Sequence, residues 1–119
     1  MNLRVIPTGV HGVLDYLASG ANLAFPAVLG LHDDAPWPAL VPRIDGVAGA
    51  AYSLITDYEL GALRVLPMPA HLAFDAAKGL FMASSPWLGC RSWRTRRYWL
   101  PHVLLGTADV LAAITTKTR

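Results

Sequence analysis

Apolar residues dominate four stretches of the chain, and the polar residues inside each stretch fall at helical spacing. The four stretches are Thr8 to Phe25, Pro38 to Thr56, Met68 to Ser84 and Tyr98 to Thr116. In the first stretch, intervals of four, four and three separate the polar residues His11, Asp15, Ser19 and Asn22. Residues at these intervals share one narrow face of an α-helix. The pattern therefore predicts four helices, each with one polar face and an otherwise apolar circumference.

A narrow polar face is the reverse of the pattern in a water-soluble bundle, whose helices carry an apolar stripe and a wide charged face. The four stretches are 17 to 19 residues long, and about 17 to 25 apolar residues span a bilayer. Of all residues, 54% are hydrophobic and 15% are charged, against about 25% charged in average soluble proteins. We therefore expect an all-α, four-helix transmembrane bundle. The alternative is a compact soluble four-helix bundle with buried His and Asp pairs.

The two halves of the chain repeat each other at a shift of 60 positions, and the motif L-R-V-[IL]-P-x3-H-x3-D begins at Leu3 and again at Leu63. The shift also aligns the following pairs: His11 with His71, Asp15 with Asp75, Gly46 with Gly106, and Thr56 with Thr116. Self-similarity at a fixed period indicates repeated architecture. We expect two tandem helical-hairpin repeats, residues 1–60 and 61–119, that run parallel and form one integral membrane domain.

The duplicated His-x3-Asp steps are the sharpest candidate site, because residues four apart share a helix face and the two copies can converge. The predicted polar core of the bundle consists of His11, Asp15, His71, Asp75, Lys78, His102 and Asp109. Three interpretations stay open: a structural hydrogen-bond network, proton or ion handling, and a divalent metal site. The structural one is favoured, because Lys78 would neutralise Asp75 and repel a metal. Asp45 is expected to pair locally with Arg43.

A dense group of arginine and aromatic side chains precedes the fourth stretch. Its members are Arg91, Trp93, Arg94, Arg96, Arg97 and Trp99. Arginine and tryptophan together are typical of the level of phospholipid headgroups. We expect this group to contact lipid headgroups or an acidic partner.

Other function classes find little support. The net charge is +2 and the basic residues form no long stripe, so nucleic acid is not an expected partner. Cys90 is the only cysteine, which excludes an intrachain disulfide and a CxxC redox motif. No nucleophile stands beside a base and no phosphate-binding glycine loop occurs. We predict no catalytic residue and no cofactor.

Several motifs resemble those of a known family. They are the segments HGVLDYL at 11–17, TDYELG at 56–61, PMPAH at 67–71, SSPWLG at 84–89 and LPH at 100–102. Together they resemble the SPW-repeat family of small bacterial membrane proteins. The second copy keeps Ser85-Pro86-Trp87, whereas the first copy reads Phe25-Pro26-Ala27. The resemblance implies four transmembrane helices in the bacterial inner membrane, and it implies no established activity.

From these features we expect a multi-pass protein of the cell inner membrane, surrounded by membrane lipids. Its expected role is structural or accessory, through self-association as a homo-oligomer or as a subunit of a larger membrane complex. The alternative is a small transporter, or a proton- or metal-handling protein, that uses the paired His and Asp residues.

Overall fold

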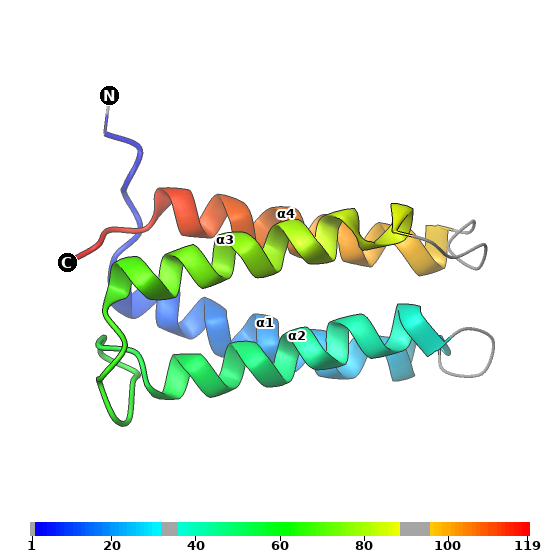
Figure 1. Ribbon diagram of the computed structural model, residues 1–119, viewed down its shortest axis with the longest axis horizontal. Coiled ribbons are helices and arrows are strands. Elements are labelled where there is room, and N and C mark those ends of the chain that lie inside the picture. The colour runs from blue at the N-terminus through cyan, green and yellow to red at the C-terminus, as the bar shows by residue number, and fades with distance from the viewer. Residues whose placement is uncertain (1, 32–35, 89–95) are drawn as a thin grey trace.

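Four helices make up the fold. The computed structural model describes residues 2–31, 36–88 and 96–119 (Figure 1). The helices are α1 (Thr8–Val28), α2 (Pro36–Leu54), α3 (Met68–Ser84) and α4 (Arg96–Thr115), and a 3-10 turn, η1 (Ser85–Trp87), follows α3. The prediction of an all-α, four-helix bundle is confirmed.

The helices form two hairpins, α1 with α2 and α3 with α4, which lie side by side along the long axis of the molecule (Figure 1). Packing is far closer within each hairpin than between them. Glycines at equivalent positions explain this closeness. A Cβ on Gly46 would lie 2.8 Å from the carbonyl oxygen of Ser19, and one on Gly106 would lie 2.5 Å from that of Gly79. Small residues at these positions let the paired helices approach closely.

Proline residues set the starts of α1 and α3 in the same way. Pro7 and Pro67 are the N-cap residues and have extended backbone angles, with ψ of 149° and 145°. Each accepts the first helical hydrogen bond, at 3.0 Å in both copies. Pro26 lies inside the last turn of α1 and does not end the helix. The helix instead ends just before Gly30, whose φ of 63° suits a residue without a Cβ.

Short backbone bridges connect the hairpins at one end of the bundle. Thr56 bridges Leu66, and Thr116 bridges Ile6 in the corresponding place. Each bridge therefore joins the end of one hairpin's second helix to the segment that leads into the other hairpin's first helix. This arrangement holds the two threonines next to the opposite hairpin.

The interior of the bundle is more polar than its exterior. Among the described residues, eleven buried residues are polar or charged and eight are hydrophobic, whereas twenty-five large hydrophobic residues are exposed. Within the described ranges, the buried hydrophobic residues form two small clusters, one around Leu31 and one around Met68. The polar faces predicted from the sequence therefore point inward.

The predicted membrane spans are wrong. Within the described parts of the chain, no helix combines the length and the apolar character needed to cross a membrane. The polar residues that face the interior interrupt each apolar stretch, and α3 has only 17 residues. This finding removes the basis for the transmembrane bundle and for the multi-pass location in the cell inner membrane.

Candidate functional site: a buried His–Asp centre

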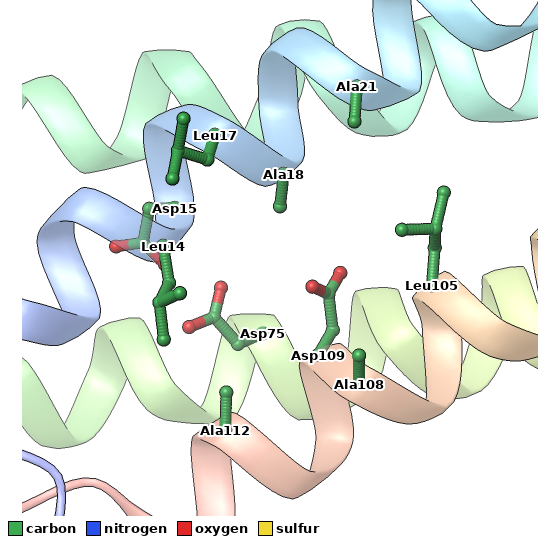
Figure 2. A pocket seen from close by; sticks show the side chains of 10 residues that line it. All are labelled: Leu14, Asp15, Leu17, Ala18, Ala21, Asp75, Leu105, Ala108, Asp109 and Ala112. Carbon is green, nitrogen blue, oxygen red and sulfur yellow. The ribbon is translucent and has the colours of Figure 1, made fainter.

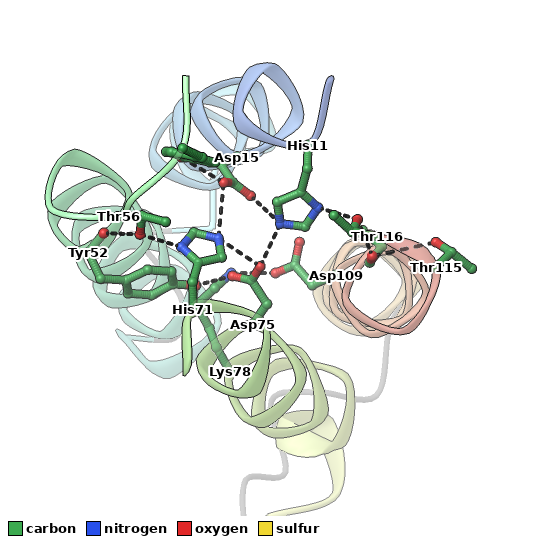
Figure 3. Close-up of polar contacts among 12 residues, drawn as sticks. His11, Asp15, Tyr52, Thr56, His71, Asp75, Lys78, Asp109, Thr115 and Thr116 are labelled. Atoms are coloured by element: carbon green, nitrogen blue, oxygen red, sulfur yellow. Dashed lines mark hydrogen bonds and ion pairs between the residues drawn. The ribbon is translucent and has the colours of Figure 1, made fainter. Parts of the chain in front are cut away.

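Two histidines and two aspartates meet inside the bundle. His11 and Asp15 come from α1, and His71 and Asp75 come from α3. Because the residues in each pair are four apart, they lie one turn above each other on the inner face of their helix. Their side chains point toward one another (Figure 3) and are between 0% and 10% exposed. We call these four residues the His–Asp centre.

The contacts in the His–Asp centre cross between the hairpins. Nε2 of His11 lies 2.8 Å from Oδ2 of Asp75 and 3.2 Å from Oδ1 of Asp15. Nε2 of His71 lies 3.1 Å from Oδ2 of Asp15 and 3.1 Å from Oδ2 of Asp75. Each histidine thus contacts the aspartate of its own helix and the aspartate of the other hairpin. The centre therefore connects two hairpins that otherwise pack loosely.

A threonine from the opposite repeat holds the other ring nitrogen of each histidine. Oγ1 of Thr116 lies 2.7 Å from Nδ1 of His11, and Oγ1 of Thr56 lies 2.7 Å from Nδ1 of His71. The single hydroxyl hydrogen of each threonine is donated to the carbonyl oxygen four residues earlier, at 2.6 Å. The threonine oxygen must therefore accept, so Nδ1 of each histidine donates its hydrogen. Both Nε2 atoms face the aspartates.

Tyrosine hydroxyls complete the surroundings of the two carboxylates. Tyr52, on α2, donates a hydrogen bond to Oδ1 of Asp75. Tyr58, in the segment after α2, donates to Oδ2 of Asp15 at 2.9 Å. Burial and the nearby carboxylate charges raise the pKa of both tyrosines above the usual range, with burial the largest cause. Both hydroxyls therefore stay protonated and act as donors.

Opposite charges inside the centre stabilise each other. Burial by itself lowers the pKa of His71, but its contacts with Asp15 and Asp75 outweigh burial and raise the pKa to about 9. Burial by itself raises the pKa of Asp75, but His11, His71 and Tyr52 hold it well below the ordinary value. Near pH 7, His71 is therefore positively charged and Asp75 is negatively charged.

Lys78 forms a second polar group next to the centre, on the α2–α3 side (Figure 3). Its Nζ lies 3.0 Å from Oδ2 of Asp45 and also pairs with Asp109. Asn22 donates to Asp45 at 2.6 Å. Burial raises the pKa of Asp45 and of Asp109, and the nearby charge of Lys78 offsets part of this rise. Burial by itself lowers the pKa of Lys78, but the two carboxylates outweigh it and raise that pKa.

Two sequence interpretations change with this geometry. Asp45 pairs with Lys78 of the other hairpin, so the expected local pair with Arg43 is wrong. Lys78 pairs with Asp45 and Asp109 rather than neutralising Asp75. The charge of Lys78 is therefore already balanced, and it is no longer an argument against a metal in the His–Asp centre.

His102 and Trp99 lie away from the centre. His102 is fully buried, and its ring meets the ring of Phe25 edge to face at 5.3 Å. Trp99 packs against the small apolar cluster around Leu31. Arg91, Trp93 and Arg94 fall outside the described residues, and of Arg96 and Arg97 only their place at the start of α4 is described.

A cavity opens beside the centre between α1 and α4 (Figure 2). Its volume is about 290 Å³. The walls are mostly alanine and leucine side chains, and three carboxyl groups reach it: Asp15, Asp75 and Asp109. The cavity thus leads from the side of the bundle to the two aspartates of the His–Asp centre.

Sequence reasoning left several contributors out of the predicted core. The predicted core does not include Thr56, Thr116, Tyr52 or Tyr58. The exact alignment of Thr56 with Thr116 in the repeat was the available signal, because a polar pair that survives in both copies favours a shared role. Tyr58 has no such counterpart, since Thr118 occupies the equivalent position.

Comparisons with protein-family models, with curated proteins and with solved structures found no match for the chain. The resemblance of its motifs to the SPW-repeat family therefore stays a prediction.

Proposed function

We propose that this protein is a structural or accessory protein that works by self-association, with copies of the chain packing through the apolar outer faces of their helices. The observation that carries the proposal is the inverted distribution of side chains, with twenty-five large hydrophobic residues exposed among those described. Monomeric proteins rarely expose contiguous apolar patches of more than a few hundred Å². A surface of this kind is expected to be covered.

The clearest apolar row lies on the outside of α1. Val10, Leu14 and Leu17 follow at helical spacing and are 52%, 41% and 65% exposed. The ionisable residues of the same helix turn, His11 and Asp15, point into the bundle. The row itself contains no charged residue, so a second apolar surface can pack on it. Leu14 and Leu17 also line the cavity between α1 and α4, so a partner on this row would cover the side of that cavity.

A second copy of the chain is the partner that fits best. Two identical rows can meet across a two-fold axis, which is the commonest symmetry of homo-oligomers. Each Å² of apolar surface covered contributes about 25 cal/mol. A helix-to-helix contact along α1 would therefore stabilise a dimer without any change within the bundle.

The mass of the purified chain in solution, measured by light scattering over a range of concentrations, tests the proposal. We expect a mass that is a whole multiple of the mass of one chain. Leu17→Glu is expected to weaken the assembly at least about tenfold, because it places a charge in the covered row. Leu63→Glu is the matched control, since Leu63 is 69% exposed but lies in the turn before α3.

A wild-type chain that stays a monomer at all concentrations would contradict the proposal. So would equal weakening by the two substitutions, because the α1 row would then have no special part in the contact.

A further inference from the structure

The distances within the His–Asp centre match those between the ligands of a small metal ion. One ligand atom from each of His11, Asp15, His71 and Asp75 can be chosen so that all four lie within 4.8 Å of one another. The nitrogen-to-oxygen distances are 2.8 to 3.2 Å. Tetrahedral ligands with bonds of about 2.0 to 2.1 Å are about 3.3 Å apart. The nitrogen-to-oxygen contacts are already at or just below this spacing, and the wider separations in the set, up to 4.8 Å, would shorten when an ion binds.

The two histidines are oriented as metal ligands are. Thr116 and Thr56 accept hydrogen bonds from Nδ1 of His11 and His71. Metal-bound histidines usually donate their second ring N–H in this way, which fixes the ring and leaves the other nitrogen for the metal. The same threonine contact occurs in both repeats, so both Nε2 atoms are turned to the same point.

The position of Nε2 of His71 also suits a metal ligand. Its Nε2 is buried and lies 3.1 Å from an oxygen of Asp15 and 3.1 Å from an oxygen of Asp75. Within the described part of the chain, however, no hydrogen bond of suitable angle joins it to either one. A nitrogen at equal distance from two oxygens and aligned with neither is aimed at the space between them.

Charge and access also suit a divalent ion. The two carboxylates balance its charge when the imidazoles are neutral, and the nearby Lys78 is already paired with Asp45 and Asp109. Because the cavity between α1 and α4 reaches Asp15 and Asp75, an ion has a route to the centre (Figure 2).

We propose that His11, Asp15, His71 and Asp75 bind one divalent metal ion of the zinc type, which ties the two hairpins together. Two nitrogen and two oxygen ligands in a tetrahedral arrangement suit Zn²⁺ and its spectroscopic substitute Co²⁺. The site goes beyond the proposed self-association and does not depend on it.

Titration of the full chain with Co²⁺ after treatment with a chelator, followed by visible absorption, tests the site. We expect one Co²⁺ per chain with the intense bands of a four-coordinate ion, and displacement by Zn²⁺. His71→Gln is expected to lower the affinity more than about a hundredfold, and Thr56→Val about ten- to a hundredfold because it removes only the support of the histidine. Glu59→Gln, which changes an exposed carboxyl that accepts from Thr8 outside the centre and the cavity, should bind as wild type does.

Absence of stoichiometric Co²⁺ binding by the folded wild-type chain would overturn the proposal. Equal loss of affinity in Glu59→Gln and His71→Gln would also overturn it. Circular dichroism shows whether His71→Gln has folded. If it has not, Thr56→Val tests the site instead, because this variant keeps all four ligands. Unchanged Co²⁺ affinity in Thr56→Val would then contradict the site. Light scattering on the same samples separates this result from the test of self-association.

Discussion

The two sides of the His–Asp centre are built from corresponding residues, yet one side is filled and the other is open. On the α2–α3 side, Tyr52 donates to Asp75 and Lys78 pairs with two carboxylates. At the shift of 60 positions, their counterparts on the α1–α4 side are Ala112 and Ala18. These two alanines line the cavity of about 290 Å³. The α1–α4 side is therefore open because it carries alanine at the two positions where the α2–α3 side carries tyrosine and lysine.

Some residues of the centre are the same in the two repeats, and others differ. Histidine, aspartate and threonine occur in both copies and make the symmetric contacts that join the hairpins. The residues that flank these contacts differ, and they decide which side of the centre is filled and which side opens to the cavity that both aspartates reach. A symmetric centre with one open side has both a fixed geometry and a route for a ligand.

Removal of the more buried carboxylate is the strongest test of this difference. Asp75→Ala is expected to lower the free energy of unfolding by about 3 to 5 kcal/mol, because it removes one of the two carboxylates that contact the buried charge of His71 and leaves the Tyr52 hydroxyl without its acceptor. Asp15→Ala should cost less, because Asp15 is 10% exposed against 6% for Asp75 and makes the longer contact with His11. Chemical denaturation of both variants measures the two values. An equal or larger loss for Asp15→Ala would show that the two sides do not differ in this way.

The tyrosine that fills the closed side gives a smaller effect. Tyr52→Phe removes only the hydroxyl that donates to the buried Asp75 and should cost about 1.5 to 3 kcal/mol, the range for hydrogen bonds to charged groups. Tyr16→Phe is the matched control, because the Tyr16 hydroxyl donates to an exposed carbonyl oxygen of Leu60. It should change stability by less than about 0.5 kcal/mol. Similar losses in the two variants, measured by denaturation, would count against a special role of Tyr52.

The stability of the metal-free protein should depend on pH in a definite direction. The pKa of His71 is about 9 in the folded chain against 6.5 for an ordinary histidine, so its contribution is complete below pH 6.5 and is lost as the pH rises to about 9. The pKa of Asp75 is lowered from 3.8, so its contribution is present above pH 3.8 and is lost in stronger acid. Thermal unfolding with a chelator present should therefore show the greatest stability between pH 3.8 and pH 6.5. A rise in stability from pH 6.5 to 9 would contradict the charged centre.

Filling the open side should have the smallest effect and the opposite sign. Ala18→Leu places a larger apolar side chain in the cavity and should stabilise the fold by about 0.5 to 2 kcal/mol, the usual range for cavity filling. The same variant should take up Co²⁺ more slowly, because the route to the centre is narrower. Thermal unfolding and stopped-flow absorption measure the two effects. Destabilisation by Ala18→Leu would mean that the space cannot accept a side chain.

The sequence predicted the helices and the inner face well, for physical reasons. Polar residues at intervals of three and four define a helix face whatever surrounds the helix, and α3 runs from Met68 to Ser84, the bounds expected from the sequence. The same reasoning marked His11, Asp15, His71 and Asp75. Composition misled the prediction of the surroundings, because hydrophobic residues on the outside of a helix do not by themselves give the length and apolar character of a membrane span.

Contacts between distant positions could not be read from spacing. Asp45 lies two residues from Arg43 in sequence, yet its partner is Lys78, which is thirty-three residues away. Likewise, the role of Tyr58 depends on how the turn after α2 folds back over α1, where the hydroxyl meets Asp15. Local charge pairing predicts neither contact. Such pairs are set by the way the hairpins dock, and only the structure shows that docking.

The central claim is that the His–Asp contacts hold the two hairpins together, and a double-mutant cycle on His11 and Asp75 tests it most directly. The two side chains come from different hairpins and lie 2.8 Å apart. The free energies of unfolding of wild type, His11→Ala, Asp75→Ala and the double variant give their coupling. We predict a coupling of more than about 1 kcal/mol, as residues in one buried network show. Effects that add to within about 0.5 kcal/mol, the behaviour of independent sites, would contradict the account.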